Sequence, residues 1–271
     1  MSRKVCILLG LLFLVKAQAW AADYRPEKPF PGAPVLFSFR EKVKKLTFLG
    51  RTFYPFAFQG RYCVLAAIPL GTSPGRYPVA VFFTGGKKEL SLEVFAKKYP
   101  EEHLKVPRKM VRYPPKVLSR IKREIRLIRS TVSRISPEPL LDGPFVWPAA
   151  GRLSSPFGLR RFFNGEPRSP HAGLDIALPE GTLVKAANRG RVVLVGDFYL
   201  PGKIVIIDHG LGIYTVYCHL KKILVKKGEL VARGQKIARS GKTGRVTGPH
   251  LHFGVYIGGV KVDPKVLLEV F

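Results

Sequence analysis

The chain has 271 residues, and 46% of them are hydrophobic, which is enough apolar material for one or two packed domains and excludes a disordered protein. Lysine and arginine together number 46 against 18 acidic residues, so the formal net charge is +28. A charge of this size favours a polyanionic neighbour such as nucleic acid, anionic lipid or a cell-wall polymer.

The start of the chain has the three parts of a secretory signal peptide, which we predict over residues 1–22. Arg3 and Lys4 make a basic start, residues 5–15 are apolar, and small alanines follow at the expected cleavage point. The apolar run is shorter than the roughly 20 residues that a membrane-spanning helix needs. We therefore expect an exported protein of the periplasm or cell envelope, which argues against nucleic acid as its partner. An uncleaved segment that anchors the chain in the membrane is the alternative.

Cysteine usage does not indicate a disulfide framework. Cys6 lies in the predicted signal peptide, and Cys63 and Cys218 fall in different predicted domains. A single pair across those domains is the alternative.

Short strands with turn sequences between them dominate residues 23–97. The runs KKLTFLG, YCVLAAIPL and YPVAVFF are rich in β-branched and aromatic residues, and GTSPGR and TGGKK supply turns. Strands of this length and spacing predict a small Ig-like β-sandwich. The segment has no histidine and few carboxylates, so we interpret it as a folding and spacing module. Binding of a partner through exposed aromatic side chains is the alternative.

The clearest predicted helix lies between Pro114–Pro115 and Pro137, within residues 98–142, which we assign as a basic helical linker. Its apolar residues are spaced by three and four positions, the period of an amphipathic helix, at Leu118, Ile121, Ile125, Ile128, Val132 and Ile135. The other face carries mostly arginine and lysine. The favoured interpretation is a solvated face of a helix that packs on a neighbouring domain, and the alternative is a surface for a membrane or an anionic polymer.

Glycine recurs between Val-, Ile- and Leu-rich runs through residues 143–271. Segments such as GTLVKAANRGRVVLVGDF, KIVIIDHG and GIYTVYCHL predict strands joined by tight turns, with little helical periodicity. We therefore predict a mainly β fold class, in which a β-rich domain with antiparallel sheets is preceded by the small sandwich and the helical linker.

Five of the six histidines lie between residues 171 and 252, a clustering that indicates a metal site to be tested. His250 and His252 lie in HLHFGVYI, where strand alternation points both side chains to one face. His171 and Asp175 lie in SPHAGLDIA. In a flat strand their Cα atoms would be about 13 Å apart, so the chain must bend there, and Gly173 permits the bend.

One carboxylate with two neutral imidazoles suits Zn²⁺, and three protein ligands leave a fourth position for a water molecule. Zinc lowers the pKa of that water to about 7, so hydroxide is available at neutral pH and a hydrolase is indicated. Spacing alone does not choose the functional residues among His171, Asp175, His209, His219, His250 and His252.

The motifs HAGLDIA, YCHL and HLHFGV occur in this order, and with their flanking residues, 143–263, they resemble the lysostaphin-type (LytM-like) peptidoglycan metallo-endopeptidases. The resemblance implies that His171, Asp175 and His252 bind zinc. It also implies that His250 and His219 are catalytic residues that do not bind the metal. The expected function is a zinc-dependent endopeptidase that hydrolyses peptide cross-links or stem peptides of peptidoglycan.

In the chemistry that the resemblance implies, zinc polarises the scissile carbonyl and activates water. His250 acts as general base and later proton donor, and His219 steadies or orients the developing tetrahedral species. The expected partner is peptidoglycan, and an anionic envelope polymer or a membrane surface is a further expected partner of the basic residues.

One residue departs from the family pattern. Cys218 stands where the family usually has glycine before the histidine, and we interpret it as a small side chain on the opposite strand face from His219. A thiol that crowds the site, becomes oxidised or competes for the metal is the alternative. His209, at the end of a strand, is interpreted as a structural turn residue, as are Asp208 and Asp263.

The alternative for the whole chain is a non-catalytic regulator or adaptor that binds the cell wall or activates an amidase. A protein of that kind is expected to lack one or more of the five site residues. All five are present in this sequence, which favours the enzyme.

Overall fold

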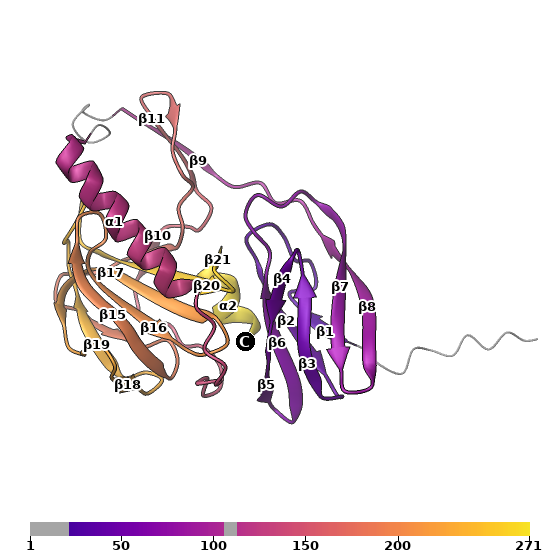
Figure 1. Cartoon of the computed structure of the whole chain (residues 1–271). Coiled ribbons are helices and arrows are strands. Elements are labelled where there is room, and N and C mark those ends of the chain that lie inside the picture. The colour runs from indigo at the N-terminus through magenta and orange to yellow at the C-terminus, as the bar shows by residue number, and fades with distance from the viewer. Residues whose placement is uncertain (1–21, 106–112) are drawn as a thin grey trace, which may run out of the picture.

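The computed structural model describes residues 22–105 and 113–271, which form two β-rich lobes side by side (Figure 1). Strands dominate both lobes, and every described strand pair except one is antiparallel, so the predicted mainly β fold class is confirmed. The predicted signal peptide, residues 1–22, lies outside the described residues except for Ala22. Within the described part of the chain, no helix is long and apolar enough to span a membrane.

The N-terminal lobe consists of two four-stranded antiparallel sheets. The first has the order β1-β2-β6-β5, with strands at Asp23–Arg25, Pro34–Phe39, Arg61–Ala67 and Pro55–Phe58. The second has the order β4-β3-β7-β8, with strands at Arg51–Phe53, Val43–Phe48, Gly75–Phe83 and Gly86–Val94. Alternate residues of β7 and β8 are buried, and side chains from both sheets, among them Phe37, Phe48 and Leu92, form a common core. The assignment of this lobe to the Ig-like class stays a prediction.

Two elements lead from this lobe to the other. Strand β9, Glu101–Leu104, pairs in parallel with β11, Arg160–Phe163, which in turn pairs with β12, Glu166–Pro167. The predicted amphipathic helix is present as α1, Pro115–Val132, although it ends before Ile135. Figure 1 shows α1 lying across the sheet of the C-terminal lobe. Its apolar side packs there through Ile128 and Val132, and its lysines and arginines are exposed.

The C-terminal lobe is built on a ten-stranded sheet with the order β10-β13-β20-β17-β16-β15-β18, and β14, β19 and β21 lie off this path. The strands along the path span Arg152–Ser155, Leu174–Ala177, His250–Ile257, Ile213–Ile223, Gly202–Asp208, Gly190–Phe198 and Leu230–Val231. The other three strands span Leu183–Lys185, Lys236–Ser240 and Val260–Val262, and helix α2 spans Pro264–Val270.

The two faces of the central strands have different surroundings. Ile176 of β13 and Leu251 and Phe253 of β20 are buried in the large hydrophobic core on one face. The alternate residues point to the opposite face, where Cys218 of β17 belongs to a smaller core that also contains Val132 of α1. The face that carries α1 is therefore also the face to which His252 points.

Aromatic and polar contacts join the two lobes. The ring of Phe271, which follows α2, lies 5.4 Å from the ring of Phe56 and 5.5 Å from that of Phe145, measured between centroids. The backbone N–H of Asp263 donates to the carbonyl oxygen of Gly32 at 2.8 Å, and the Asp263 carboxylate accepts a hydrogen bond from the first turn of α2. Asp263 thus has the structural role that its position predicted.

Candidate active site

The predicted zinc ligands converge because β13 pairs with β20. In this register the Cα of Asp175 lies opposite that of His252, so the two side chains share one face of the sheet. His171 reaches the same point because the chain bends ahead of β13. A Cβ on Gly173 would lie 2.5 Å from the carbonyl oxygen of Phe253 and 2.7 Å from the His252 ring. Glycine at this position therefore leaves the room that the His252 ring occupies.

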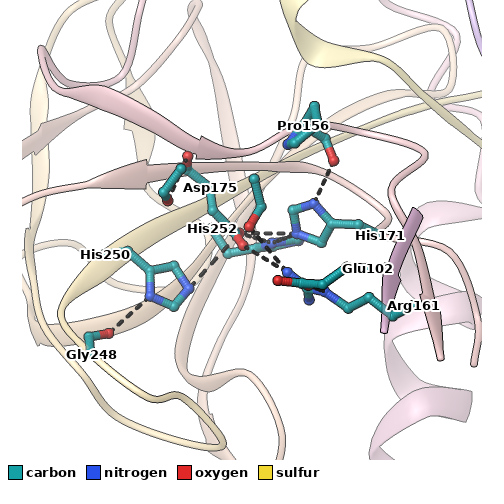
Figure 2. A network of polar contacts seen from close by, with 10 residues as sticks. Glu102, Pro156, Arg161, His171, Asp175, Gly248, His250 and His252 are labelled. Carbon is teal, nitrogen blue, oxygen red and sulfur yellow. Dashed lines mark hydrogen bonds and ion pairs between the residues drawn. The ribbon is translucent and has the colours of Figure 1, made fainter. Parts of the chain in front are cut away.

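One potential metal-binding atom from each of His171, Asp175 and His252 meets the other two at this point, as Figure 2 shows. We call these three residues the cluster. Asp175 Oδ1 lies 3.0 Å from His171 Nε2 and 2.8 Å from His252 Nδ1, and the two nitrogens are 3.1 Å apart. Tetrahedral ligands at about 2.0–2.1 Å from a zinc ion are separated by roughly 3.3 Å, which is close to this spacing. Both the types of the three ligand atoms and their separations therefore fit zinc.

A backbone carbonyl fixes which nitrogen of His171 carries the proton. His171 Nδ1 lies 2.9 Å from the carbonyl oxygen of Pro156, which can only accept, so Nδ1 donates and Nε2 of the neutral ring turns its lone pair to the cluster. Lone pairs of His171 Nε2 and Asp175 Oδ1 at 3.0 Å repel each other unless a cation lies between them. A single proton bridges two atoms at most, whereas a metal ion satisfies all three. The arrangement itself thus favours a metal.

The two predicted catalytic histidines lie beside the cluster. The ring centroids of His219 and His250 are 4.8 Å apart, and His250 Nε2 lies 3.8 Å from Asp175 Oδ1. His219 Nδ1 donates to the carbonyl oxygen of Thr243 and His250 Nδ1 to that of Gly248, each at 2.9 Å. In its neutral form each ring therefore has Nε2 available as a hydrogen-bond and proton acceptor.

Burial keeps two of these imidazoles neutral. Removal from water lowers the pKa of His219 to about 3, and the neighbouring ring of His252 adds to the effect. Burial also lowers the pKa of His252, and the nearby Asp175 carboxylate opposes the shift. Neutral imidazole is the form that binds zinc and accepts a proton, so both rings are in that form at neutral pH.

The approach of His219 to the cluster depends on an irregularity in β17. The φ angle of His219 is +62°, and the pairing of β17 with β16 shifts register around this residue. Regular alternation would place Cys218 and His219 on opposite faces of β17. The strand is irregular here, so the sequence-based interpretation that they lie on opposite faces is wrong. Cys218 lies opposite His252 in the register of β17 and β20, and the His219 ring centroid is 6.1 Å from that of His252, so all three share one face.

The Cys218 thiol is nevertheless no rival for the metal. It is buried in the smaller core under α1, and burial raises its pKa above the ordinary value for a thiol. Zinc binds the thiolate rather than the thiol. Cys218 therefore acts as a small apolar side chain in the packing beneath the site.

His209 lies outside the cluster, in agreement with its predicted structural role. It is fully buried, its Nδ1 lies 2.8 Å from the carbonyl oxygen of Arg189, and its Nε2 lies 2.8 Å from the Thr215 hydroxyl. Asp208, next to it, accepts a hydrogen bond from the N–H of Gly210 and so stabilises the turn. Both residues therefore form hydrogen bonds that hold the end of β16 and the turn that follows it.

We expect His209 to make the protein less stable in acid. Burial lowers the pKa of His209 to about 4 from its ordinary 6.5, so between these values the unfolded chain binds a proton that the folded chain does not. The free energy of unfolding then falls as the pH drops from 7 to 4, by up to about 3 kcal/mol from this group. Urea unfolding of the wild type and of His209→Gln at several pH values measures the difference. Equal pH slopes for the two proteins would contradict the prediction.

Sequence reasoning missed two residues of the network in Figure 2. Arg161 on β11 lies beside the cluster, with Nη2 4.0 Å from Asp175 Oδ2, and its Nε donates to Glu102 on β9 at 3.0 Å. The signal that could have found them is the match between two acidic residues, Glu101 and Glu102, and two basic ones, Arg160 and Arg161. Their strand pairing was not predictable, because the two segments are 59 residues apart.

Comparisons with known proteins point to one family. The model of peptidase family M23 matches residues 169–264. The chain is similar to a crystal structure described as a peptidase M23 from Pseudomonas aeruginosa, with 34% identity, a TM-score of 0.74, and coverage of 90% of this chain and 96% of that one. The match therefore extends over both lobes.

Curated relatives match part of the chain. Peptidoglycan DD-endopeptidase ShyA from Vibrio cholerae is 48% identical over 113 residues, which are 41% of this chain and 26% of ShyA. Peptidoglycan DD-endopeptidase ShyB from the same organism is 50% identical over 94 residues, 35% of this chain and 22% of ShyB. The matched region thus spans about a quarter of the length of these relatives.

Proposed function

Because this chain belongs to peptidase family M23, we propose that it is a zinc-dependent endopeptidase that hydrolyses peptide cross-links or stem peptides of peptidoglycan. The observation that carries the proposal is the meeting of His171 Nε2, Asp175 Oδ1 and His252 Nδ1 within 3.1 Å of one another, with two further imidazoles beside them. A regulator that has lost its catalytic function has no need of this arrangement.

His171, Asp175 and His252 would hold the zinc ion. When bound, zinc supplies a polarised scissile carbonyl and an acidified water. The chain's own residues keep the ligands in place, since the Pro156 carbonyl fixes the tautomer of His171 and β13 fixes Asp175 opposite His252. These contacts allow the three residues to present their ligand atoms without rearrangement.

His250 is the better placed of the two non-ligand histidines to act as general base. Its Nε2 lies 3.8 Å from Asp175 Oδ1, beside the point where the three ligand atoms meet, and its Nδ1–H is already used, so Nε2 is the atom that can accept a proton there. The Gly248 carbonyl accepts from Nδ1 in both protonation states and keeps the ring oriented. The proton then passes from His250 to the nitrogen of the leaving amine.

His219 has a different task in this proposal. Its pKa of about 3 makes it a weak base, and its Nδ1–H is used by Thr243, so Nε2 can only accept. A neutral ring of this tautomer cannot donate a hydrogen bond to an oxyanion. We therefore assign His219 the orientation of the attacking water, whose second hydrogen it accepts while His250 takes the first.

The substrate class rests on the relatives. ShyA and ShyB are named peptidoglycan DD-endopeptidases, and their similarity to part of this chain supports peptidoglycan as its substrate. The test is incubation of the zinc-loaded protein with purified peptidoglycan, followed by mass spectrometry of the released muropeptides. Loss of cross-linked dimers, prevented by a chelator, is expected. Intact muropeptides with zinc bound would reject the endopeptidase and favour the regulator or adaptor.

We further propose that the protein is exported to the cell envelope and meets an anionic polymer or membrane surface there. The predicted signal peptide supports export. Helix α1 supports the anionic partner, because several exposed basic residues have no acidic partner in the described part of the chain: Lys116, Lys122, Arg123, Arg126 and Arg129. Sedimentation with intact peptidoglycan sacculi at rising salt tests this, and binding that is insensitive to salt would argue against it.

A further inference from the structure

Strand β9 belongs to the segment before α1, yet its Glu102 is part of the polar network around the three predicted ligand atoms (Figure 2). It pairs in parallel with β11, which places Glu101 opposite Arg160 and Glu102 opposite Arg161. Backbone hydrogen bonds hold both ends of the pair, from the Arg160 N–H to the carbonyl oxygen of Pro100 and from the Asn164 N–H to that of Leu104, each at 2.9 Å. This is the one parallel pairing among the described strands.

Arg161 connects Glu102 of β9 to Asp175, the predicted zinc ligand. Its Nε donates to Glu102 Oε2 at 3.0 Å, its Nη2 donates to the Ser155 hydroxyl at 3.0 Å, and the same Nη2 lies 4.0 Å from Asp175 Oδ2 (Figure 2). Two hydrogen bonds therefore hold the guanidinium, and the Nη2 that donates to Ser155 also faces the Asp175 carboxylate. Its side chain is only 28% exposed, so solvent screens its field weakly.

The two carboxylate oxygens of Asp175 have separate surroundings. Oδ1 lies within 3.0 Å of a nitrogen of His171 and of His252, whereas Oδ2 faces Arg161. A metal-binding carboxylate that binds through one oxygen is commonly held at the other by a partner outside the metal's own ligands. Without such a partner it is free to rotate about its Cβ–Cγ bond, which moves Oδ1 out of the cluster.

We propose that Arg161 is a positioning residue for Asp175, and that Glu102 of β9 holds Arg161 in its place. This rests on the proposed zinc site. The segment that joins the two lobes is then a working part of the metal centre, because β9 carries the acidic residue that fixes the arginine. Changes in the linker are therefore expected to alter zinc affinity through Glu102 and Arg161.

The neighbouring pair on the same two strands offers a matched control. Arg160 and Glu101 also form an ion pair, at 2.5 Å, and alternation turns both side chains away from the cluster. Their side chains are 56% and 41% exposed, and among the described residues neither side chain has a hydrogen bond or ion pair to a residue of the site. A general effect of breaking an ion pair between β9 and β11 would therefore appear in both pairs, and a positioning effect in only one.

The experiment measures zinc affinity by competition with a chromogenic chelator, together with the melting temperature of the zinc-free protein. We expect Arg161→Gln to lower the affinity by about 10- to 100-fold and Glu102→Gln by a smaller factor. Arg161→Lys should recover part of the loss, because it restores the charge but not both hydrogen bonds. Arg160→Gln and Glu101→Gln should bind zinc as the wild type does, and all melting temperatures should agree within a few degrees.

A double variant adds a second criterion. If Glu102 acts through Arg161, the variant with both changes binds zinc no more weakly than Arg161→Gln alone. Wild-type affinity in Arg161→Gln, or equal losses in the Arg160 and Arg161 variants, would overturn the proposal. Wild-type protein that binds no zinc would overturn both this proposal and the proposed function. Wild-type protein that binds zinc but leaves peptidoglycan intact would refute only the proposed function, because the affinities of the variants are measured without substrate.

Discussion

Replacing His252 with alanine is expected to remove zinc from the protein and abolish peptide-bond hydrolysis. The substitution deletes one of three ligand atoms, the one that lies 2.8 Å from Asp175 Oδ1 and 3.1 Å from His171 Nε2. Zinc sites bind with about 10–16 kcal/mol shared among four ligands, so the loss of one is worth about 3 kcal/mol, or more than 100-fold in affinity. Metal analysis of dialysed protein and muropeptide digestion measure both effects.

The control for this prediction is metal removal from the wild type. Treatment with a chelator should stop digestion, and added zinc should restore it in the wild type but not in His252→Ala at the same concentration. Circular dichroism of the variant checks that the lobe is folded, because the altered ring lies near the face that also packs under α1. Full zinc content in the variant would show that His252 is not a ligand.

Replacing His250 with alanine should have the opposite signature, with zinc retained and turnover lost. The side chain lies 3.8 Å from Asp175 but outside the group of three ligand atoms. Loss of a general base lowers kcat by about 10²- to 10⁴-fold. KM should change little, because the zinc ion and its ligands remain. Initial rates on a defined cross-linked muropeptide and metal analysis of the same sample provide the measurement.

A parallel variant, His219→Ala, decides between the two imidazoles. If His250 is the base and His219 orients water, His250→Ala loses more activity than His219→Ala, and both variants keep their zinc. A larger loss of kcat in His219→Ala than in His250→Ala would reverse the assignment.

The sequence allowed the convergence of His250 and His252 to be predicted, because strand alternation is a local property. It also allowed the bend between His171 and Asp175 to be predicted, since Gly173 makes it sterically possible. Placement of Asp175 opposite His252 depends on the register between β13 and β20, strands that are distant in the chain, and no local pattern determines it. The family resemblance supplied that part.

Residues whose placement depends on irregular or long-range pairing were predicted wrongly or missed. The positive φ of His219 breaks the alternation on which the interpretation of Cys218 relied. Arg161 and Glu102 were missed because β9 pairs with β11 across the boundary between the predicted linker and the following domain. An ion pair between such segments has no sequence signature, since most charged residues simply face water.

Three histidines of the site are oriented by backbone carbonyl oxygens. The oxygen of Pro156 accepts from His171, that of Thr243 from His219, and that of Gly248 from His250. Every amino acid supplies the same oxygen, so a point substitution at these three positions cannot delete the group that orients the imidazole. The hydrogen bonds that orient the three imidazoles therefore tolerate substitutions at these positions. They are vulnerable instead to insertions and deletions, because a loop of altered length moves the oxygen and releases the ring. Engineering of substrate range should accordingly vary side chains in these loops and keep their lengths fixed.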